Sequence, residues 1–405
     1  MLTRCGKGTR KMASKQNLAK FPAKFSRHFF FRATFPFVML MLMLIWATSA
    51  LGQATSDGYV SYTNDIVPSV PWSIHIVKID RTARNVRLCT GLGGGNFLGM
   101  GIVSDQVKAV PAGGGSPLAA INGDFYEKAR QYPGRPRDLQ IRNGEVLTQP
   151  TGHACFWIDS AGNPQMTNII SRFRVIWPDG QSTPFGMNSE RTNGTVILYT
   201  AVLGASTLTD GGWEYVLEQS PGNDWLPLRA GRIYQARVRR INHLGNSPIE
   251  PHTVVLSLSS DLTNQVPPLK PGDTVQLSTE SIPDLSGVEV AIGGGPTLVQ
   301  DSQIMSWKGW VHLPQPRTAL GWNKKYIYLV EVDGRQLDLS LGMTFTQLAK
   351  YLHDLGCEQA MNLDGGGSAT LWAFGEVKNS PSEGQERPAP NSLVLVTSTP
   401  VAAAK

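Results

Sequence analysis

The chain has 405 residues, with 37 Lys and Arg against 31 Asp and Glu, which gives a formal net charge of +6. Nine of the basic residues and none of the acidic ones lie in residues 1–54, so the rest of the chain has 28 basic and 31 acidic residues. The basic balance of the whole chain therefore gives no electrostatic footprint for a nucleic acid partner. The chain beyond residue 54 exceeds one minimal core, which predicts one large domain or two interleaved ones.

Residues 1–54 have the pattern of an export signal. A basic region precedes an apolar run from Phe35 to Trp46, and small residues follow up to Ala54. The basic region is long, which is compatible with a later start such as Met12. Because a spanning helix needs about 20 apolar residues, cleavage near Ala54 is favoured over an uncleaved N-terminal anchor. We therefore expect a protein that is secreted or held in the cell envelope, periplasmic or extracellular, and that touches a membrane only through this segment.

Four cysteines are present, and Cys5 falls within the predicted signal. The spacings of Cys89, Cys155 and Cys357 fit no metal-binding motif. One disulfide with a free thiol and three buried thiols are both compatible with this pattern.

The N-terminal part of the mature chain predicts strands with few helices. Residues 74–79 and 86–89 alternate apolar and polar around a turn, which predicts a hairpin. In that hairpin His75 lies on the polar face, where we expect it to be solvated rather than catalytic. A short helix is predicted over 102–110, and a second hairpin around 142–145.

Residues 151–290 predict an almost entirely β section, because turn dipeptides separate short apolar runs and no long amphipathic helix is present. The predicted strands are 154–158, 174–177, 195–200, 213–217, 232–241, 252–258 and 273–279.

A strand–helix–strand unit is predicted near the C-terminus. A strand over 326–332 is followed by a helix that Thr344 caps and Gly356 ends, and the next strand runs into Asn362. The expected fold class is α+β, β-rich with a mixed sheet and few helices. If the two strands are parallel, Asp333 and Asp364 lie at the same edge of the sheet, where binding sites gather.

Two polar motifs follow apolar strands in the same way. Residues 362–370 place an Asn, an Asp, three glycines and a Ser in one turn, and Asn122-Gly123-Asp124 follows the short strand 118–121. Consecutive glycines suit a backbone that a ligand approaches closely, and their bare N–H groups can bind an anion. Plain turns with local hydrogen bonds are the alternative reading of both motifs. The repetition of Asn-x-Asp favours two motifs that converge on one site.

A third apolar run meets glycines at 291–299, and Arg317 begins a later strand. The planar guanidinium of an arginine can bond two oxygens of a phosphate or carboxylate at once. A surface ion pair is the alternative role for Arg317.

Four segments, taken in order, resemble the phosphodiester glycosidase family. They are Ala120-Ile121-Asn122-Gly123-Asp124-Phe125-Tyr126, Gly293-Gly294-Gly295-Pro296 with Leu298-Val299, Arg317-Thr318-Ala319 with Gly321, and Asn362-Leu363-Asp364-Gly365-Gly366-Gly367-Ser368. Asp333-Gly334-Arg335 and the segment from Arg387 to Asn391 are also similar to the family. The resemblance runs from about Ile74 to Val396, which predicts one family-like domain over 55–400 that includes the β-rich section 151–290. One departure is Asp124, where the uncovering enzyme of that family has glycine.

The resemblance implies hydrolysis of a sugar-1-phosphodiester in a glycan or envelope polysaccharide, with a phosphate-linked saccharide as the partner. Such a site must hold the phosphate, support an oxocarbenium-like centre and place a water or carboxylate nucleophile. The catalytic candidates are Asp364, Asp333 and Asp124. The candidates for binding substrate are Asn122, Arg317, Thr318, Asn362, Gly365, Gly366, Gly367, Ser368, Arg387, Gly294 and Gly295.

Other functions remain open at the level of the sequence. The three carboxylates with Asn and Ser could instead hold a hard cation such as Ca²⁺ or Mg²⁺, although no cofactor is certain. A non-catalytic carbohydrate- or cell-wall-binding envelope protein and a metal-dependent phosphodiesterase that breaks the P–O bond are the two alternatives to a glycosidase.

Overall fold

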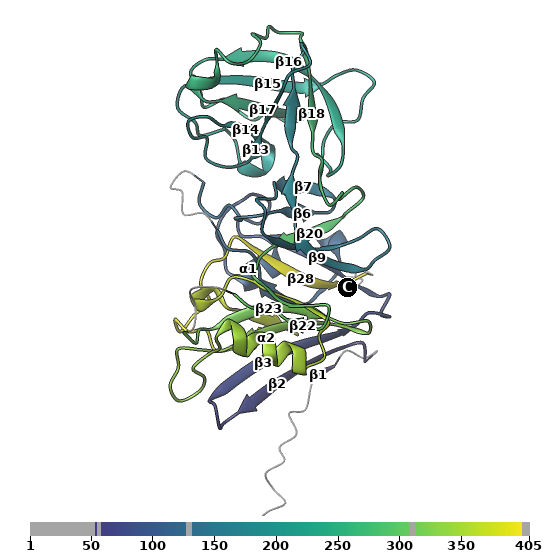
Figure 1. The fold of residues 1–405 in the computed structure, drawn as a ribbon, viewed down its shortest axis with the longest axis vertical. Coiled ribbons are helices and arrows are strands. Elements are labelled where there is room, and N and C mark those ends of the chain that lie inside the picture. The colour runs from purple at the N-terminus through teal and green to yellow at the C-terminus, as the bar shows by residue number, and fades with distance from the viewer. Residues whose placement is uncertain (1–52, 55–57, 127–131, 308–312, 399–405) are drawn as a thin grey trace, which may run out of the picture. The chain divides into compact units, whose positions relative to one another are not determined.

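The computed structural model describes residues 53–54, 58–126, 132–307 and 313–398. The predicted export signal lies outside these ranges, apart from residues 53–54. All the described residues belong to one compact unit, which is built mainly from antiparallel sheets (Figure 1). No helix in the described ranges has the length and apolar character that crossing a membrane requires.

The first large sheet has eight strands, and each pairs with its neighbours in antiparallel fashion. In spatial order they are β1 (Gln53–Ala54), β2 (Val60–Val67), β3 (Trp72–Asp80), β24 (Tyr326–Val332), β23 (Arg317–Trp322), β25 (Gln359–Asn362), β21 (Thr297–Gln300) and β22 (Gln303–Ile304). Because β23 lies between β24 and β25, those two strands run in the same direction without touching. The β-rich character is confirmed, but the predicted α+β class with a strand–helix–strand unit is not.

A five-stranded sheet packs on this first sheet. Its order is β27 (Glu376–Val377), β26 (Leu371–Ala373), β5 (Pro117–Asn122), β28 (Asn391–Thr397) and β4 (Val86–Leu92). Ile121 and Leu393 from this sheet share a buried core with Leu320 and Leu329 of the first sheet. Burying such side chains gives about 1.5–3 kcal/mol each, so this core fixes the two sheets face to face.

In the described part of the chain, two α-helices cover the outer faces of these sheets. Helix α2 (Phe345–Asp354) buries Leu348 and Leu352 against the first sheet. It begins with the predicted cap, since Thr344 Oγ1 accepts a hydrogen bond from Gln347 N at 3.2 Å and the Gln347 side chain bonds back to Thr344 N. Helix α1 (Val103–Lys108) buries Val103 against the second sheet, within the predicted range 102–110.

The described residues in the middle of the chain form three further sheets. A five-stranded sheet has the order β7 (Glu145–Thr148), β6 (Gln140–Arg142), β20 (Val290–Gly293), β8 (Ala154–Ile158) and β9 (Pro164–Asn168), which confirms the hairpin around 142–145. An eight-stranded sheet has the order β12 (Ser182–Pro184), β11 (Arg174–Ile176), β18 (Thr274–Ser278), β16 (Ile233–Asn242), β15 (Trp213–Gln219), β17 (Thr253–Leu258), β14 (Val196–Tyr199) and β13 (Gly186–Met187), with β13 and β14 parallel. Strands β10 (Ile170–Ser171) and β19 (Ser281–Ile282) form a small separate pair. The strands predicted within 151–290 are confirmed.

Two local predictions were wrong. Residues 74–79 and 86–89 do not form a hairpin, because β3 pairs with β2 and β24 while β4 pairs with β28 in the other sheet. His75 is not solvated: it is 3% exposed. Val77 and Ile79, which lie on the same face of β3, belong to the core that the second sheet covers.

The cysteines resolve one alternative. Cys89, Cys155 and Cys357 are free, buried thiols.

Candidate active site

A cavity of about 730 Å³ contains seven of the predicted site residues. Its wall combines bare backbone with three guanidinium groups and aromatic rings. The predicted residues that line it are Gly294, Gly295, Arg317, Asn362, Asp364, Gly365 and Gly366. The cavity therefore gathers residues from all four segments that resemble the phosphodiester glycosidase family, since Phe125 of the first segment also lines it.

Asp364 brings a carboxylate to this cavity at the end of β25. Its Oδ1 accepts a hydrogen bond from Gly365 N at 2.9 Å, which holds the side chain over the turn. Burial raises the pKa of Asp364, although Ser368 and the Arg387 charge oppose the shift. A side chain at Gly365 would place its Cβ 2.7 Å from Pro316 O, so the turn can press against β23 only with glycine there.

Two arginines lie on the same cavity wall. Arg317 is 6% exposed, donates from Nε to Met343 O at 2.8 Å, and has its guanidinium 4.1 Å from the centre of the Phe345 ring. Arg335 donates from Nε to Gln315 Oε1 at 2.8 Å. Burial, together with the charge of Arg335, lowers the pKa of Arg317 to about 10. Among the residues that the structure describes, neither guanidinium has a carboxylate partner, so the pair presents uncompensated positive charge to the cavity.

Asn362 offers a polar atom with no partner. Its Nδ2 donates to Gly295 O at 3.0 Å and to Leu363 O at 2.5 Å. Its Oδ1 is buried and has no hydrogen-bond partner in the described part of the chain. An acceptor left unpaired costs about 1–3 kcal/mol, which a ligand hydroxyl would recover.

The backbone of residues 294–295 completes this wall. A Cβ at Gly294 would lie 2.8 Å from Asn362 O, so a larger residue would push β25 away from the cavity. Arg137 Nη2 donates to Gly294 O at 2.7 Å, and its guanidinium lies 4.4 Å from the centre of the Phe125 ring. The sequence analysis missed Arg137. The only signal was its place in a run of arginines shortly after the Asn122 motif.

A histidine–aspartate pair is the second feature that the sequence analysis missed. His153 lines the cavity with its side chain 52% exposed, and its Nδ1 lies 3.0 Å from Asp138 Oδ2. Asp138 is fully buried; burial opposes its ionisation, but hydrogen bonds from Thr151 and Leu139 outweigh this and lower the pKa of Asp138. The buried carboxylate fixes the imidazole and leaves Nε2 as its other polar atom.

Asn122 joins the two Asn-x-Asp motifs, as their repetition predicted, but it does not line the cavity. Its Nδ2 donates to Asp364 O at 2.6 Å, and its Oδ1 accepts from Thr318 Oγ1 at 2.6 Å and from Thr370 N at 3.0 Å. Asn122 and Thr318 are both fully buried. In this structure they support the Asp364 turn.

Three further predicted residues, Gly367, Ser368 and Arg387, do not line the cavity. Arg387 donates from Nη2 to Ser368 Oγ at 2.7 Å and pairs with Glu383 at 3.2 Å. Gly367 lies against the Glu383 and Arg387 side chains, which a Cβ there would meet.

Asp124 is fully buried beside the cavity. Its Oδ1 and Oδ2 accept hydrogen bonds from Phe125 N and Asp138 N, and Arg137 Nη2 lies 3.9 Å away. Burial raises the pKa of Asp124 to about 7 against these interactions.

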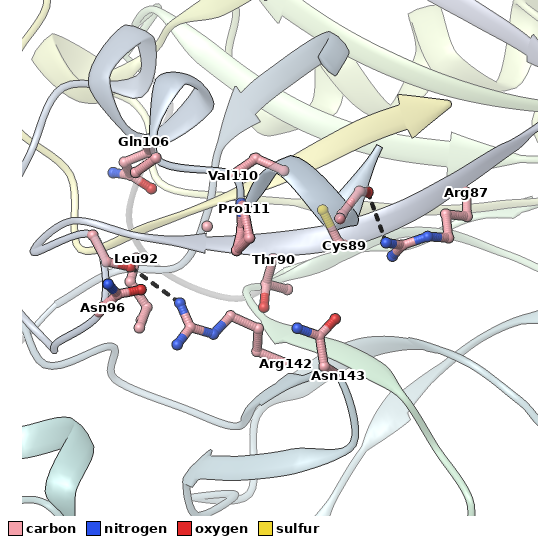
Figure 2. Close-up of a pocket in the computed structure, with 15 residues that line it drawn as sticks. Arg87, Cys89, Thr90, Leu92, Asn96, Gln106, Val110, Pro111, Arg142 and Asn143 are labelled. Atoms are coloured by element: carbon pink, nitrogen blue, oxygen red, sulfur yellow. Dashed lines mark hydrogen bonds between the residues drawn. The ribbon is translucent and has the colours of Figure 1, made fainter. Parts of the chain in front are cut away.

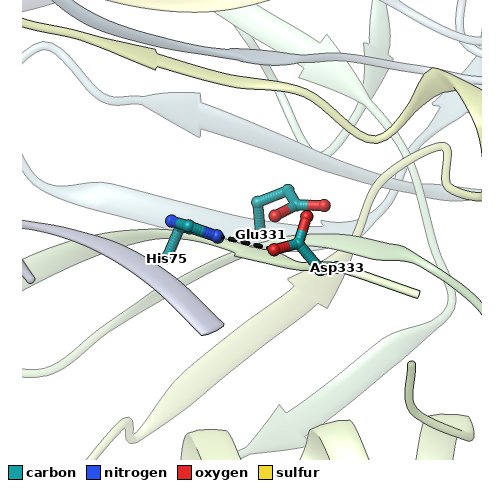
Figure 3. A group of neighbouring side chains, drawn as sticks. All are labelled: His75, Glu331 and Asp333. Carbon is teal, nitrogen blue, oxygen red and sulfur yellow. Dashed lines mark hydrogen bonds and ion pairs between the residues drawn. The ribbon is translucent and has the colours of Figure 1, made fainter. Parts of the chain in front are cut away.

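Asp333 lies in a different group of buried side chains, with His75 and Glu331 (Figure 3). It does not line the cavity with Asp364. Among the described residues this is the one set of three such side chains close enough to share a metal ion, and it contains neither Asp364 nor Asp124. The three aspartates considered as Ca²⁺ or Mg²⁺ ligands therefore do not meet.

A smaller cavity of about 340 Å³ lies elsewhere and contains none of the predicted residues (Figure 2). Its two cations bond to backbone, since Arg142 donates to Gly95 O at 3.1 Å and Arg87 to Gly114 O at 2.7 Å. The polar groups of the candidate site are thus concentrated in the larger cavity.

Part of the chain that builds this cavity is similar to a known family. Residues 231–396 match the phosphodiester glycosidase family model (NAGPA), which confirms the family resemblance. A comparison with curated proteins gave no match.

Solved structures share the fold. A hypothetical protein from Synechocystis aligns with a TM-score of 0.67 at 18% identity, covering 83% of this chain and 62% of its own. A "Putative exported protein" from Burkholderia pseudomallei K96243 aligns with a TM-score of 0.62 at 21% identity, covering 80% of this chain and 74% of its own. The zebrafish N-acetylglucosamine-1-phosphodiester alpha-N-acetylglucosaminidase catalytic domain, auto-inhibited by its pro-peptide, aligns with a TM-score of 0.43 at 18% identity, covering 86% of this chain and 84% of its own.

Proposed function

We propose that this protein is an exported hydrolase that cleaves a sugar-1-phosphodiester in a glycan or envelope polysaccharide. The observation that carries the proposal is the meeting of Arg317 and Arg335 with Asp364 in one cavity. Two guanidiniums without carboxylate partners in the described chain suit a phosphodiester, because each can bond two of its oxygens. The family match at 231–396 supports the same reaction class.

In hydrolysis at the anomeric carbon of the sugar, the cavity residues would have the following roles. Water attacks the anomeric carbon, the bond from that carbon to the phosphate oxygen breaks, and its electron pair leaves with the phosphate monoester. Arg317 and Arg335 stabilise the charge on that leaving group. Asp364 stabilises the positive charge that develops on the sugar. Asn362 Oδ1 accepts a hydrogen bond from a sugar hydroxyl.

His153 accepts the proton of the attacking water in this proposal. Its Nδ1 faces the Asp138 carboxylate at 3.0 Å, so Nδ1 carries a proton and Nε2 presents a lone pair to the cavity. We expect His153→Gln to lower kcat by about 10²–10⁴-fold, the usual contribution of acid–base catalysis, with a small effect on KM. An unchanged kcat with an unchanged pH profile would remove His153 from the mechanism.

The predicted catalytic roles of Asp124 and Asp333 are hypotheses that substitution of each residue would test. Neither lines the cavity, so we expect Asp364→Asn to lower turnover far more than the same change at either position. The reverse order would move the reacting centre away from Asp364.

Export is part of the proposal because of the basic and apolar pattern of residues 1–54. We expect the chain isolated from its native host to begin after Ala54 and to be found in the envelope or medium. Cytoplasmic protein with an intact N-terminus would contradict this part.

The test is turnover of a panel of sugar-1-phosphodiesters in water enriched in ¹⁸O, with Asp364→Asn and the exposed control Asp224→Asn alongside. Label in the released sugar, lost in Asp364→Asn and kept in Asp224→Asn, supports the glycosidase. Label in phosphate indicates a phosphodiesterase that breaks the P–O bond. Binding of a glycan with no turnover of any member indicates a carbohydrate-binding protein.

A further inference from the structure

We infer that His75, Glu331 and Asp333 form a buried binding site for a divalent transition-metal ion. The ligand atoms of these three side chains lie within 4.8 Å of one another (Figure 3). That spacing fits ligands on a single ion, because two bonds of about 2.0–2.2 Å place their ends at most about 4.4 Å apart and small side-chain shifts close the difference. The site is separate from the proposed reaction.

The strand register builds the group. Glu331 and His75 are opposite each other on the antiparallel strands β24 and β3, so they share a face of the sheet. Asp333 follows two residues after Glu331 and returns to the same face. Both strands lie inside the eight-stranded sheet, which gives three ligands fixed by rigid backbone.

The buried carboxylate of Glu331 lacks hydrogen-bond partners in the described part of the chain. Its side chain is fully buried, and neither carboxylate oxygen has a hydrogen-bond partner within the described ranges. The Asn379 side chain interacts with Glu331, but its Nδ2 also donates to Ala369 O at 3.2 Å, so Asn379 can supply at most one N–H to the two carboxylate oxygens. A buried carboxylate with so little compensation is costly, and a cation between Glu331, Asp333 and His75 would satisfy both of its oxygens.

The surrounding contacts orient the other two ligands. His75 Nδ1 lies 2.8 Å from Tyr62 Oη, and Asp333 Oδ1 accepts a hydrogen bond from Ser380 N at 2.7 Å. Metal-binding histidines and carboxylates are commonly held by such outer hydrogen bonds. His75 Nε2 and Asp333 Oδ2, now 2.8 Å apart, are thereby directed toward each other and toward Glu331.

The kinds of ligand atom in this site indicate which class of metal ion it would prefer. One imidazole nitrogen with two carboxylates suits Zn²⁺ or Mn²⁺, whereas Ca²⁺ and Mg²⁺ favour sites made of oxygen alone. Asp333 is followed by Gly334 and Arg335, so a bound ion would also anchor the turn that carries Arg335 to the cavity.

The experiment uses the full chain, dialysed against EDTA and then equilibrated with Zn²⁺ or Mn²⁺, with Mg²⁺ and Ca²⁺ as comparators. Bound metal is measured by mass spectrometry after removal of free ion, together with the thermal midpoint. Glu331→Gln keeps the shape of the side chain and removes its charge, and the exposed Glu190→Gln is the matched control.

We expect the wild type and Glu190→Gln to hold one equivalent of Zn²⁺ or Mn²⁺ more than Glu331→Gln. We also expect the order of the thermal midpoints of the wild type and Glu331→Gln to change when metal is added. Without metal, Glu331→Gln melts at or above the wild type, because Gln keeps the shape of a buried carboxyl group that lacks hydrogen-bond partners in the described ranges. With metal, only the wild type and the control gain stability. Equal metal content in all three proteins, or a wild type that binds no ion and melts unchanged after EDTA, would overturn the inference.

Discussion

The change of Asn122 to Ala tests how the two polar motifs are joined. The Asn122 side chain makes three buried hydrogen bonds, to Asp364 O, Thr318 Oγ1 and Thr370 N, at 2.6, 2.6 and 3.0 Å. Asn122→Ala removes all three and leaves their partners buried without replacements, at about 1–3 kcal/mol for each. We expect the free energy of unfolding to fall by about 3–9 kcal/mol, a large part of the roughly 5–15 kcal/mol typical of a domain.

Urea unfolding followed by tryptophan fluorescence and circular dichroism measures this loss. The control is Asn168→Ala, because Asn168 is exposed at the end of β9 and we expect a change within about 0.5 kcal/mol. Thr318→Val, which removes one of the three bonds, should cost about 1–2 kcal/mol. A loss below about 1 kcal/mol for Asn122→Ala would refute the supporting role and return Asn122 to the substrate contacts that the sequence suggested.

Three further outcomes are expected from the site and the core. Arg317→Met should lower kcat/KM for a sugar-1-phosphodiester by about 10–150-fold, the equivalent of one charge-assisted hydrogen bond of about 1.5–3 kcal/mol; an equal loss on an uncharged aryl glycoside would contradict a role in binding phosphate. Because burial raises the pKa of Asp364, which must be ionised to act, kcat/KM should fall on acidification at a pH above the ordinary carboxyl range near 3.9; an acid limb at or below that value would count against Asp364. Burial also raises the pKa of the Cys89, Cys155 and Cys357 thiols. Iodoacetamide should therefore alkylate them far more slowly in native than in denatured protein, as measured by mass spectrometry. Rapid labelling of the native protein would be incompatible with the described core.

The parts of the fold that depend on local pattern could be predicted from the sequence. The strands within 151–290 follow from alternation and turn residues, and Thr344 begins α2 because its capping hydrogen bonds involve only its own first turn. The Asn122 and Asp364 motifs also meet as expected. Each motif can be recognised in the sequence because glycine and Asn follow an apolar strand.

The parts that depend on pairing between distant segments could not be predicted. His75 looks polar-faced within its own strand, and only the packing of the second sheet against Val77 and Ile79 shows that this face is covered. The same limit explains the wrong hairpin, since the turn after residue 80 connects two sheets. His153 gave no signal by itself, because Asp138, the residue that orients it, is recognisable only by its burial in three dimensions.

The order of strands in the five-stranded sheet that contains β5 limits how early in synthesis this part of the chain can fold. Strand β5 lies between β26 and β28, and β28 also separates it from β4. Both partners of β5 come from the last part of the chain, so during synthesis β4 and β5 leave the ribosome long before their neighbours exist. Pairing between segments so far apart in sequence is slow, because the ends of a long loop must be brought together first. The Asn122 turn at the end of β5 therefore takes its final form only after residues 391–397 have been made, and a fragment limited to residues 231–396 would lack the strand on which that turn is built.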